Sequence, residues 1–395
     1  MQIVIFSYNF LPQDDAESYC TARFANALAE FGHQVHVVTL EHAKGVPEDV
    51  VNELLSPRVQ VTRVPKKKAD KPLFSRLWFR TTEWNAVDLL RCINTLKKIL
   101  RSYDHPILIS RLNPVASNIV GWHCRKDAHK WVAHFSDPFP WFRAKWPMNW
   151  AQDHWCRRFL RDADYCSVTC PDVLQFFMDW NPLVYEKSQS KFVLVPHIGE
   201  PLLSCSEHVN FDFSKTPTIA HAGMLCPERY VPQLISELQT VKNSFTFLQV
   251  GWISDSDEQS FQISGVQFTR FRPTSPHDVS TIFLSATMNL VVDVMTELDY
   301  TPYLPSKFAY LVFTEAPILV YAKQGSAMHR YSIEYKNAGI YFADVNQSGS
   351  LSTMVSIILN GDTRNNTFNR TSLRAEFSKE RAISNLLQLL TIDNS

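Results

Sequence analysis

Glycine is scarce in this chain of 395 residues, and its spacing excludes two large classes of nucleotide-binding protein. Only 11 glycines are present, and no two lie closer than ten positions, the shortest interval being that from Gly339 to Gly349. A Walker phosphate loop and the G-x-G-x-x-G fingerprint both need glycines much closer together than this. Any nucleotide must therefore be bound by other means, such as cationic side chains.

Long apolar runs and paired cysteine motifs are also missing. No uncharged apolar run reaches the roughly 18 residues that a bilayer span needs, and the opening MQIVIFS lacks the basic region of a signal peptide. The eight cysteines contain no C-x-x-C pair, so we expect buried thiols rather than a disulfide framework or a structural zinc. These absences predict a cytoplasmic protein without a resident metal.

Basic residues and tryptophans concentrate in the first half of the chain. Residues 58–161 hold 21 Lys and Arg against 7 Asp and Glu, although the whole chain has a net charge of zero. Nine of the ten tryptophans precede residue 181, and several adjoin cations, as in 73–80, 141–150 and 155–160. Such a surface suits an anionic membrane, but it also suits nucleic acid, or it is a solvated basic face above core tryptophans.

Strands and helices alternate along the first half. A β-branched apolar run at 2–7 is followed by a helical stripe ending at Gly32 and by a second apolar run at 33–40. A strand, a helix and a strand within forty residues form a βαβ unit, which predicts a parallel sheet. Further strands are expected at 59–64, 107–110, 131–134, 165–169 and 192–195, with the clearest helix at 85–103.

The alternation restarts after a polar break at about 201–216. We expect strands at 217–222, 245–250, 266–270, 288–292, 317–321 and 338–342, and helices at 230–241, 276–284, 305–314, 347–360 and 373–391. The sequence thus predicts an α/β protein with two Rossmann-like domains, 1–205 and 206–374, and a C-terminal helix at about 375–395 that can pack back on the first. Ligands bind beyond the carboxyl ends of such strands, so the expected site is the cleft between the domains.

Several segments, in order, resemble family 4 glycosyltransferases. They are IVIFSYNFLPQ with FGHQVHVVTL, SRLNPVASNIVGW, HFSDPFPW, ADYCSVTCPDVLQFF, KFVLVPHIGEP, HAGMLCPER and PSKFAYLVFTEAPIL. The resemblance implies the GT-B fold, with two Rossmann-like domains facing each other across a cleft. It also implies transfer of a sugar from a nucleotide-sugar donor with retention of anomeric configuration. The first domain would bind the acceptor and the second the donor.

The resemblance assigns a set of donor residues in the second half. HAGMLCPER looks like the family's phosphate-binding turn, which assigns Gly223 and Arg229 to the diphosphate. PSKF looks like the start of the donor-site helix, which adds Ser306 and Lys307. A cation in the first turn of a helix opposes the helix dipole, so Lys307 there indicates an anion nearby. Because we see no metal-ligand cluster, these cations are expected to act without a metal ion.

The chain also departs from the family pattern. Met224 replaces an arginine of the turn, and Pro302 and Tyr310 stand where the family has glutamates, the second of which holds the ribose. Glu297 and Asp299, just ahead of Lys307, are the candidates to replace them. Tyr310 keeps its place among the donor-binding positions. A further candidate, for the nucleobase, is Arg270.

On the acceptor side, two residues follow a buried strand. His134 ends that strand and Asp137 comes three residues later, and both resemble the family's first-domain cleft residues, which makes them the catalytic candidates. In a retaining transfer the leaving phosphate takes the acceptor's proton, so His134 would position the sugar rather than act as a base. The loop of Asp14, Asp15 and Ser18, where the family often has glycines, is the candidate acceptor contact.

The sequence therefore predicts a retaining glycosyltransferase that needs only its nucleotide-sugar co-substrate. The acceptor would be a lipid-linked glycan or a polysaccharide in lipopolysaccharide, capsule or exopolysaccharide synthesis, met at the inner face of the cell membrane by the basic, Trp-rich first domain. Met224, Pro302 and Tyr310 motivate an alternative, a catalytically weakened GT-B protein that binds sugars or acts as a scaffold. A nucleic-acid-modifying enzyme ranks third, and no nucleic-acid partner is expected.

Overall fold

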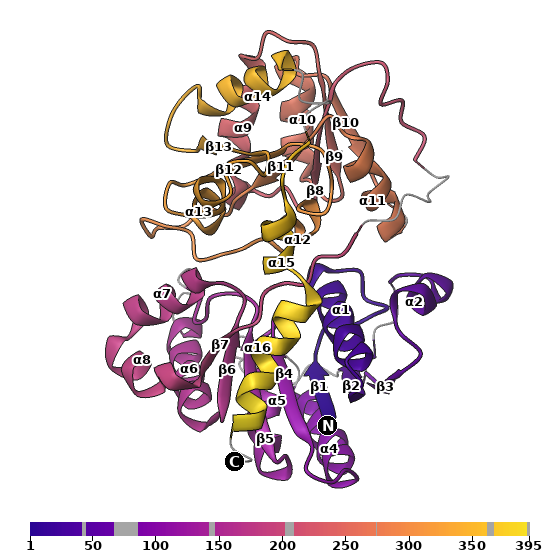
Figure 1. Cartoon of the computed structure of the whole chain (residues 1–395), viewed down its shortest axis with the longest axis vertical. Coiled ribbons are helices and arrows are strands. Elements are labelled where there is room, and N and C mark those ends of the chain that lie inside the picture. Colours follow the sequence, from indigo (N-terminus) through magenta and orange to yellow (C-terminus); the bar gives the residue numbers. More distant parts are fainter. Residues whose placement is uncertain are drawn as a thin grey trace. The chain divides into compact units, whose positions relative to one another are not determined.

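The computed structural model describes residues 1–41, 45–66, 86–141, 147–201, 209–273, 275–361 and 367–392. It divides the chain into two compact units (Figure 1). The first unit comprises Met1–Ile198 together with Lys379–Ser395, and the second comprises Gly199–Ser378. The sequence prediction placed the same divisions at 205/206 and 374/375.

A seven-stranded parallel sheet forms the centre of the first unit. Its strand order is β3-β2-β1-β4-β5-β6-β7. Residues Ile3 to Phe6 of β1 are all fully buried, because a parallel sheet is covered by helices on both faces. The strands are β1 (Gln2–Ser7), β2 (Gln34–Leu40), β3 (Val59–Val64), β4 (Ile107–Leu112), β5 (Lys130–Phe135), β6 (Tyr165–Val168) and β7 (Phe192–Leu194).

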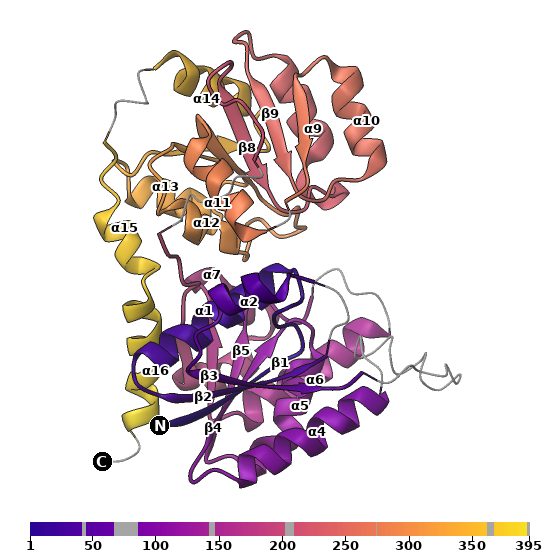
Figure 2. The ribbon, with the colours of Figure 1, turned by 90° about the vertical axis from the view of Figure 1, so that its right-hand side faces the viewer.

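Helices cover both faces of this sheet (Figure 2). On one face, α1 and α16 pack side by side and share one apolar cluster with β1, β2 and β4. On the other face, α4 and α5 pack against each other and against the sheet. The helices of this unit are α1 (Ala16–Glu30), α2 (Glu48–Leu54), α4 (Ala86–Arg101), α5 (Ala116–Cys124), α6 (Met148–Asp162), α7 (Pro171–Trp180), α8 (Pro182–Ser188) and α16 (Lys379–Ile392).

The second unit repeats the plan with a six-stranded parallel sheet, in the order β10-β9-β8-β11-β12-β13. The strands are β8 (Thr218–Ala222), β9 (Thr246–Val250), β10 (Phe268–Phe271), β11 (Met288–Val292), β12 (Ile318–Ala322) and β13 (Ile340–Asp344). Between and after them lie α9 (Val231–Gln239), α10 (Asp255–Ser264), α11 (Pro276–Ser285), α12 (Ser306–Leu311), α13 (Ala327–Glu334), α14 (Ser350–Asn360) and α15 (Thr371–Glu376). Local signals set several boundaries: α11 begins with a capping box between Ser275 and Asp278, and α10 ends at Gly265 with a positive φ.

The strand order reverses direction once in each sheet. In the first unit, β1 lies between β2 and β4, and in the second unit β8 lies between β9 and β11. Helices that leave neighbouring strands on opposite sides open a crevice at such a point, at the carboxyl ends of the strands. Each unit therefore has one place where its topology favours a ligand.

The helix predicted at 373–391 is in fact two helices. Phe377, between α15 and α16, is fully buried against Phe308 and Tyr331 of the second unit. By contrast, Ile383 and Leu386 of α16 are buried in the core of the first unit. One continuous helix does not serve both cores, so the chain breaks its helix where it passes from one unit to the other.

Neither a membrane span nor a disulfide occurs in the parts of the chain that the structure describes. No helix there has both the length and the apolar character for crossing a bilayer. Six cysteines are buried free thiols and Cys226 is a half-buried one, whereas Cys205 lies outside the described residues.

Candidate functional site

The turn after β8 lies at the switch point of the second unit. Gly223 directly follows β8 and has a φ of +116°, which L side chains rarely adopt. A Cβ at this position would lie 2.8 Å from the Lys307 Nζ atom, so the turn and the lysine are in close contact. Gly223 and Lys307, 84 positions apart in the sequence, are thus brought together as predicted for a single binding site.

Arg229 follows β8 in the chain and hydrogen-bonds to the end of β11, the neighbouring strand at the switch point. It ends the short 3-10 helix Pro227–Arg229 after β8, and its guanidinium donates to the carbonyl oxygen of Val292, the last residue of β11, at 2.6 Å. Tyr230 follows with a φ of +53°, a left-handed conformation that turns the chain into α9. Arg229 lies close enough to Lys307 for its charge to oppose protonation of that lysine.

Lys307 is a half-buried cation whose partners are neutral. Its Nζ lies 3.2 Å from Nε2 of His221, and neither Lys307 nor Arg229 pairs with a carboxylate among the residues that the structure describes. Burial, and then the charge of Arg229, lower the pKa of Lys307 well below its ordinary value. Two neighbouring cations without a counter-ion favour the binding of an anion. Since α12 has only six residues, this environment matters more than the helix dipole.

Two residues behind Lys307 were not predicted from the sequence. His221 of β8 and Gln249 of β9 are fully buried partners in the parallel register of the two strands, and the His221 Nδ1 lies 2.8 Å from the Gln249 Oε1. The amide nitrogen of Gln249 donates in turn to the Gly223 carbonyl oxygen at 2.7 Å. A signal was present: each is a polar residue one position before the end of its strand, and apart from the first residue, a threonine, the rest of each strand is apolar.

The remaining predicted donor residues lie on three elements: the helix of Lys307, the loop that follows β11, and the edge strand β10. Ser306 and Tyr310 belong to α12 with Lys307, and both are half-buried. Glu297 and Asp299 are exposed in the loop after β11. Arg270, on the edge strand β10, forms an ion pair with Glu258 of α10, and the structure shows no contact between it and Lys307 or Arg229.

A buried polar cluster occupies the switch point of the first unit. Arg111 of β4 lies in register between Ser7 of β1 and His134 of β5. Its guanidinium donates to Glu17 of α1 at 2.9 Å, and both side chains are more than nine-tenths buried. Sequence reasoning missed the pair of Glu17 and Arg111, because 94 positions separate them.

His134 is held rigidly but keeps one free ring nitrogen. Its Nδ1 lies 2.9 Å from the Ser167 hydroxyl, and its ring stacks on Phe24. Its Nε2 is buried and has no hydrogen-bond partner among the described residues. Burial, and then the charges of Arg111 and His197, lower the pKa of His134, so the imidazole is neutral. A neutral imidazole can exchange a hydrogen bond with a hydroxyl group but does not provide a charge.

The other predicted residues of the first unit have structural partners. Asp137 accepts a hydrogen bond from Asn113 at 3.2 Å. Asp15 is the N-cap of α1 and accepts from the Ser18 amide at 2.7 Å, while Asp14 is exposed and accepts from the Tyr19 hydroxyl. The Ser18 hydroxyl is buried without a hydrogen-bond partner in the described part of the chain. The predicted catalytic role of Asp137 and the predicted acceptor contacts of Asp14, Asp15 and Ser18 stay predictions.

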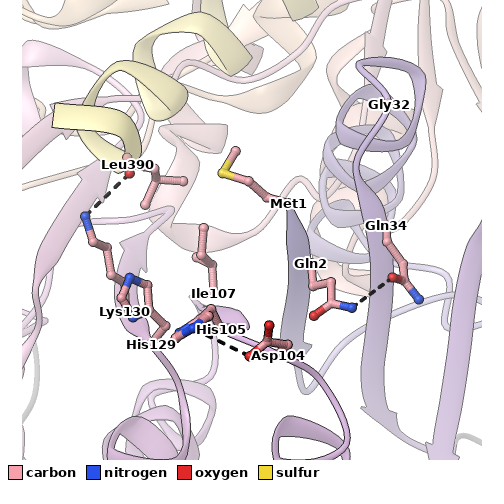
Figure 3. A pocket seen from close by; sticks show the side chains of 10 residues that line it. All are labelled: Met1, Gln2, Gly32, Gln34, Asp104, His105, Ile107, His129, Lys130 and Leu390. Atoms are coloured by element: carbon pink, nitrogen blue, oxygen red, sulfur yellow. Dashed lines mark hydrogen bonds and ion pairs between the residues drawn. The ribbon is translucent and has the colours of Figure 1, made fainter. Parts of the chain in front are cut away.

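A cavity of about 620 Å³ lies at the amino ends of the strands of the first sheet, away from the switch-point residues at their carboxyl ends (Figure 3). It is lined by the first residues of four strands, Gln2, Gln34, Ile107 and Lys130, so it faces the amino ends of the strands. None of the predicted site residues lines it. Among the described residues, no group of three or more His, Cys, Asp or Glu side chains is placed to hold a metal ion.

Comparison with known families decides what the first unit is. Residues 18–184 match the model of the family described as the glycosyl transferase 4-like domain. These residues form a glycosyl transferase 4-like domain. The matched residues include Ser18, Arg111, His134 and Asp137, and the match agrees with the predicted resemblance to family 4 glycosyltransferases. No protein of curated function matches the chain by sequence.

Solved structures extend the likeness from this glycosyl transferase 4-like domain to the whole chain. Sucrose-phosphate synthase from Thermosynechococcus elongatus is 15% identical, with a TM-score of 0.73 over 99% of this chain and 98% of that one. The Anabaena protein HepE, solved with UDP and glucose, is 12% identical, with a TM-score of 0.66 over 99% and 100%. The lipopolysaccharide outer core galactosyltransferase WaaB is 11% identical, with a TM-score of 0.61 over the full length of both chains. The predicted GT-B fold is confirmed.

Proposed function

We propose that the protein is a retaining glycosyltransferase that transfers a sugar from a nucleotide-sugar donor to a lipid-linked or polysaccharide acceptor. The acceptor would belong to surface glycan synthesis, such as lipopolysaccharide, capsule or exopolysaccharide. One observation carries the proposal: Lys307 adjoins the turn at Gly223, the charge of Arg229 acts on Lys307, and neither cation has a carboxylate partner among the described residues. A diphosphate supplies the missing negative charge. HepE, a structural neighbour, was solved with UDP and glucose, and WaaB is a lipopolysaccharide outer core galactosyltransferase.

The two cations would act at the bond that breaks. During transfer, the bond from the anomeric carbon to the donor phosphate oxygen breaks and a bond to the acceptor oxygen forms. The acceptor's proton passes to the leaving phosphate, so no separate base is needed. Negative charge grows on the diphosphate, and Lys307 and Arg229 would stabilise it more in the transition state than in the ground state. His134 would position a sugar hydroxyl through its free Nε2.

The donor site is tested by calorimetry and thermal shift against UDP-, GDP-, ADP- and TDP-linked sugars. Lys307→Ala and Arg229→Ala are each expected to weaken binding by about 1.5–3 kcal/mol, the range of charge-assisted hydrogen bonds. Lys242→Ala, which removes an exposed lysine of the same unit, is the matched control and should leave binding unchanged. Unchanged affinity in both site variants would refute the phosphate assignment.

A measurement of sugar transfer and donor hydrolysis distinguishes an active enzyme from a catalytically weakened protein that binds sugars or acts as a scaffold. Met224, which stands where the family has an arginine, is 54% exposed and offers no charge to the donor. If the protein binds a nucleotide sugar but neither transfers nor hydrolyses it with any glycolipid acceptor, the sugar-binding or scaffold function replaces the catalytic one.

Transfer is expected to need no metal ion. Lys307 and Arg229 supply the positive charge that a divalent cation supplies in other enzymes. We expect activity to persist after dialysis against a chelator, measured with the donor sugar that binds best. Activity that disappears and returns with Mg²⁺ or Mn²⁺ would contradict this prediction.

The first unit is proposed to bind the anionic inner face of the cell membrane. On α5 and α6, Arg158 lies over the rings of Trp122 and Trp155, and Trp150 is 65% exposed at the start of α6. Amphipathic rings and cations of this kind favour a lipid headgroup region. Other parts of the predicted basic surface, 73–80 with Arg143 and Lys145, lie outside the described residues.

A further inference from the structure

A series of hydrogen bonds links Lys307 through His221 and Gln249 to Gly223, and its donors and acceptors can be assigned in only one way. The amide nitrogen of Gln249 lies 2.7 Å from the Gly223 carbonyl oxygen, 3.3 Å from that of Trp252 and 3.4 Å from that of Val250. Only an NH₂ group can face three carbonyl oxygens, so the amide oxygen of Gln249 must face His221. This fixes the orientation of the Gln249 side chain.

The orientation of Gln249 determines the proton on His221. Because the Gln249 Oε1 accepts, the His221 Nδ1 at 2.8 Å must carry the hydrogen. The His221 Nε2 then carries a lone pair, and it accepts a hydrogen bond from the Lys307 Nζ at 3.2 Å. Burial, and then the charge of Lys307, lower the pKa of His221, which agrees with a neutral ring. The donor and the acceptor of each hydrogen bond in this series are thereby fixed.

A neutral partner has a different effect on a lysine from that of a carboxylate. A carboxylate would fix Lys307 in place but would also cancel its charge and repel an anion. An imidazole with its lone pair toward Nζ fixes the same lysine and leaves the charge uncompensated. At its other end, the series holds the Gly223 carbonyl, so it fixes the turn and the lysine relative to each other.

We propose that His221 and Gln249 are positioning residues that hold Lys307 and the Gly223 turn in the geometry that receives a nucleoside diphosphate, without neutralising the lysine. This inference rests on the proposed function, since it concerns the same donor site. It assigns a role to two buried polar side chains that the family resemblance did not indicate.

The test is calorimetric binding of UDP, GDP, ADP and TDP, using the one that the wild-type chain binds most tightly. His221→Phe removes the acceptor and is expected to weaken binding about 10- to 100-fold. His221→Gln places an amide oxygen near the position of Nε2 and should recover most of that loss. His221→Glu keeps an acceptor but adds a negative charge, and it should bind at least as weakly as His221→Phe.

Two controls separate positioning from a general loss of structure. In the Lys307→Ala background, His221→Phe should cause no further loss, because the two residues act through one interaction. His36→Phe is the matched control in the first unit, since His36 is also buried on a strand with both ring nitrogens bonded, and it should leave affinity unchanged. Circular dichroism and thermal unfolding verify that each variant is folded.

The outcomes distinguish this inference from the proposed function. If the wild-type chain binds none of the four nucleotides, the proposed function fails and the inference fails with it. If the wild-type chain binds and Lys307→Ala weakens binding, but His221→Phe binds normally or His221→Gln binds no better than His221→Phe, only the positioning role is refuted.

Discussion

Lys307 shows, at the scale of a single residue, how a binding function acts against stability. The lysine is half-buried beside Arg229 without a carboxylate partner in the described residues, and burial lowers its pKa. The unfolded chain therefore holds a proton on this lysine over a pH range in which the folded chain releases it. Stability then rises with pH from the folded pKa up to the ordinary lysine value of about 10.4.

We expect Lys307→Met to stabilise the protein in the absence of nucleotide. At pH 7 the gain should be about 1–3 kcal/mol, because the variant removes the cost of burying an uncompensated charge. The gain should shrink as the pH rises toward 9, while the stabilisation of the wild type by nucleotide disappears in the variant. Urea unfolding at several pH values, with Lys242→Met as the control, measures both effects. A gain that does not depend on pH would contradict the linkage.

The residues that sequence reasoning found and missed differ in the kind of signal that identifies them. Gly223, Arg229 and Lys307 were predicted because each occurs in a short segment that resembles the family's donor site. His221 and Gln249 act through a contact between neighbouring strands, and Glu17 and Arg111 through a contact across 94 positions. Such contacts depend on strand order, which no local pattern in the sequence contains.

At the scale of elements, regular periodicity was sufficient to predict the strands. The runs at 2–7, 59–64 and 288–292 coincide with β1, β3 and β11 as observed. β1 and β11 are buried on both faces, so each appears as a nearly continuous apolar run. β3 is an edge strand, and its valines at 59 and 61 alternate with polar residues, two of which are exposed. The helix predicted at 373–391 was wrong because its apolar pattern continues through Phe377 even though the residues on either side belong to different cores.

The helix α6 carries the features proposed for membrane binding, and its charges are not equally available. Arg157 pairs with Asp153, and Arg161 pairs with Asp162, whereas Arg158 has its guanidinium over Trp122 and Trp155. A cation held over two indole rings keeps its charge and has already lost conformational freedom before it meets a membrane.

Arg158→Glu is expected to weaken binding to anionic vesicles by about 2 kcal/mol, roughly 1 kcal/mol for each unit of charge changed. Co-sedimentation with vesicles containing an anionic phospholipid measures it, and activity on a soluble acceptor should be unaffected. Lys242→Glu makes the same charge change on the second unit and is the control. If reversal of Arg143, Lys145, Arg157 and Arg158 together leaves sedimentation unchanged, the basic surface has another function.

At the scale of the whole molecule, the two units have separate cores and should unfold separately. Leu386 of α16 is 1% exposed in the core of the first unit, and Leu386→Ala should cost about 2–5 kcal/mol there. In calorimetric scans, the transition of the first unit should move to lower temperature. Bound nucleotide should raise only the transition of the second unit.

The neighbouring Leu387 provides the control for this prediction. It is only partly buried against the same core, so Leu387→Ala should cost less. A single transition that nucleotide and Leu386→Ala both shift would show that the two units unfold together.

The place of α16 in the chain also determines when the first unit can be completed during synthesis. Its sheet has left the ribosome once residue 198 is free, but the helix that covers part of one face begins at Lys379. At about 5–20 residues per second, the ribosome needs about 10–40 s to make the intervening segment 199–378. Throughout this interval the apolar groove for Ala382, Ile383 and Leu386 is open to solvent and to chaperones. The helix that closes the first domain is thus translated only after the whole of the second unit.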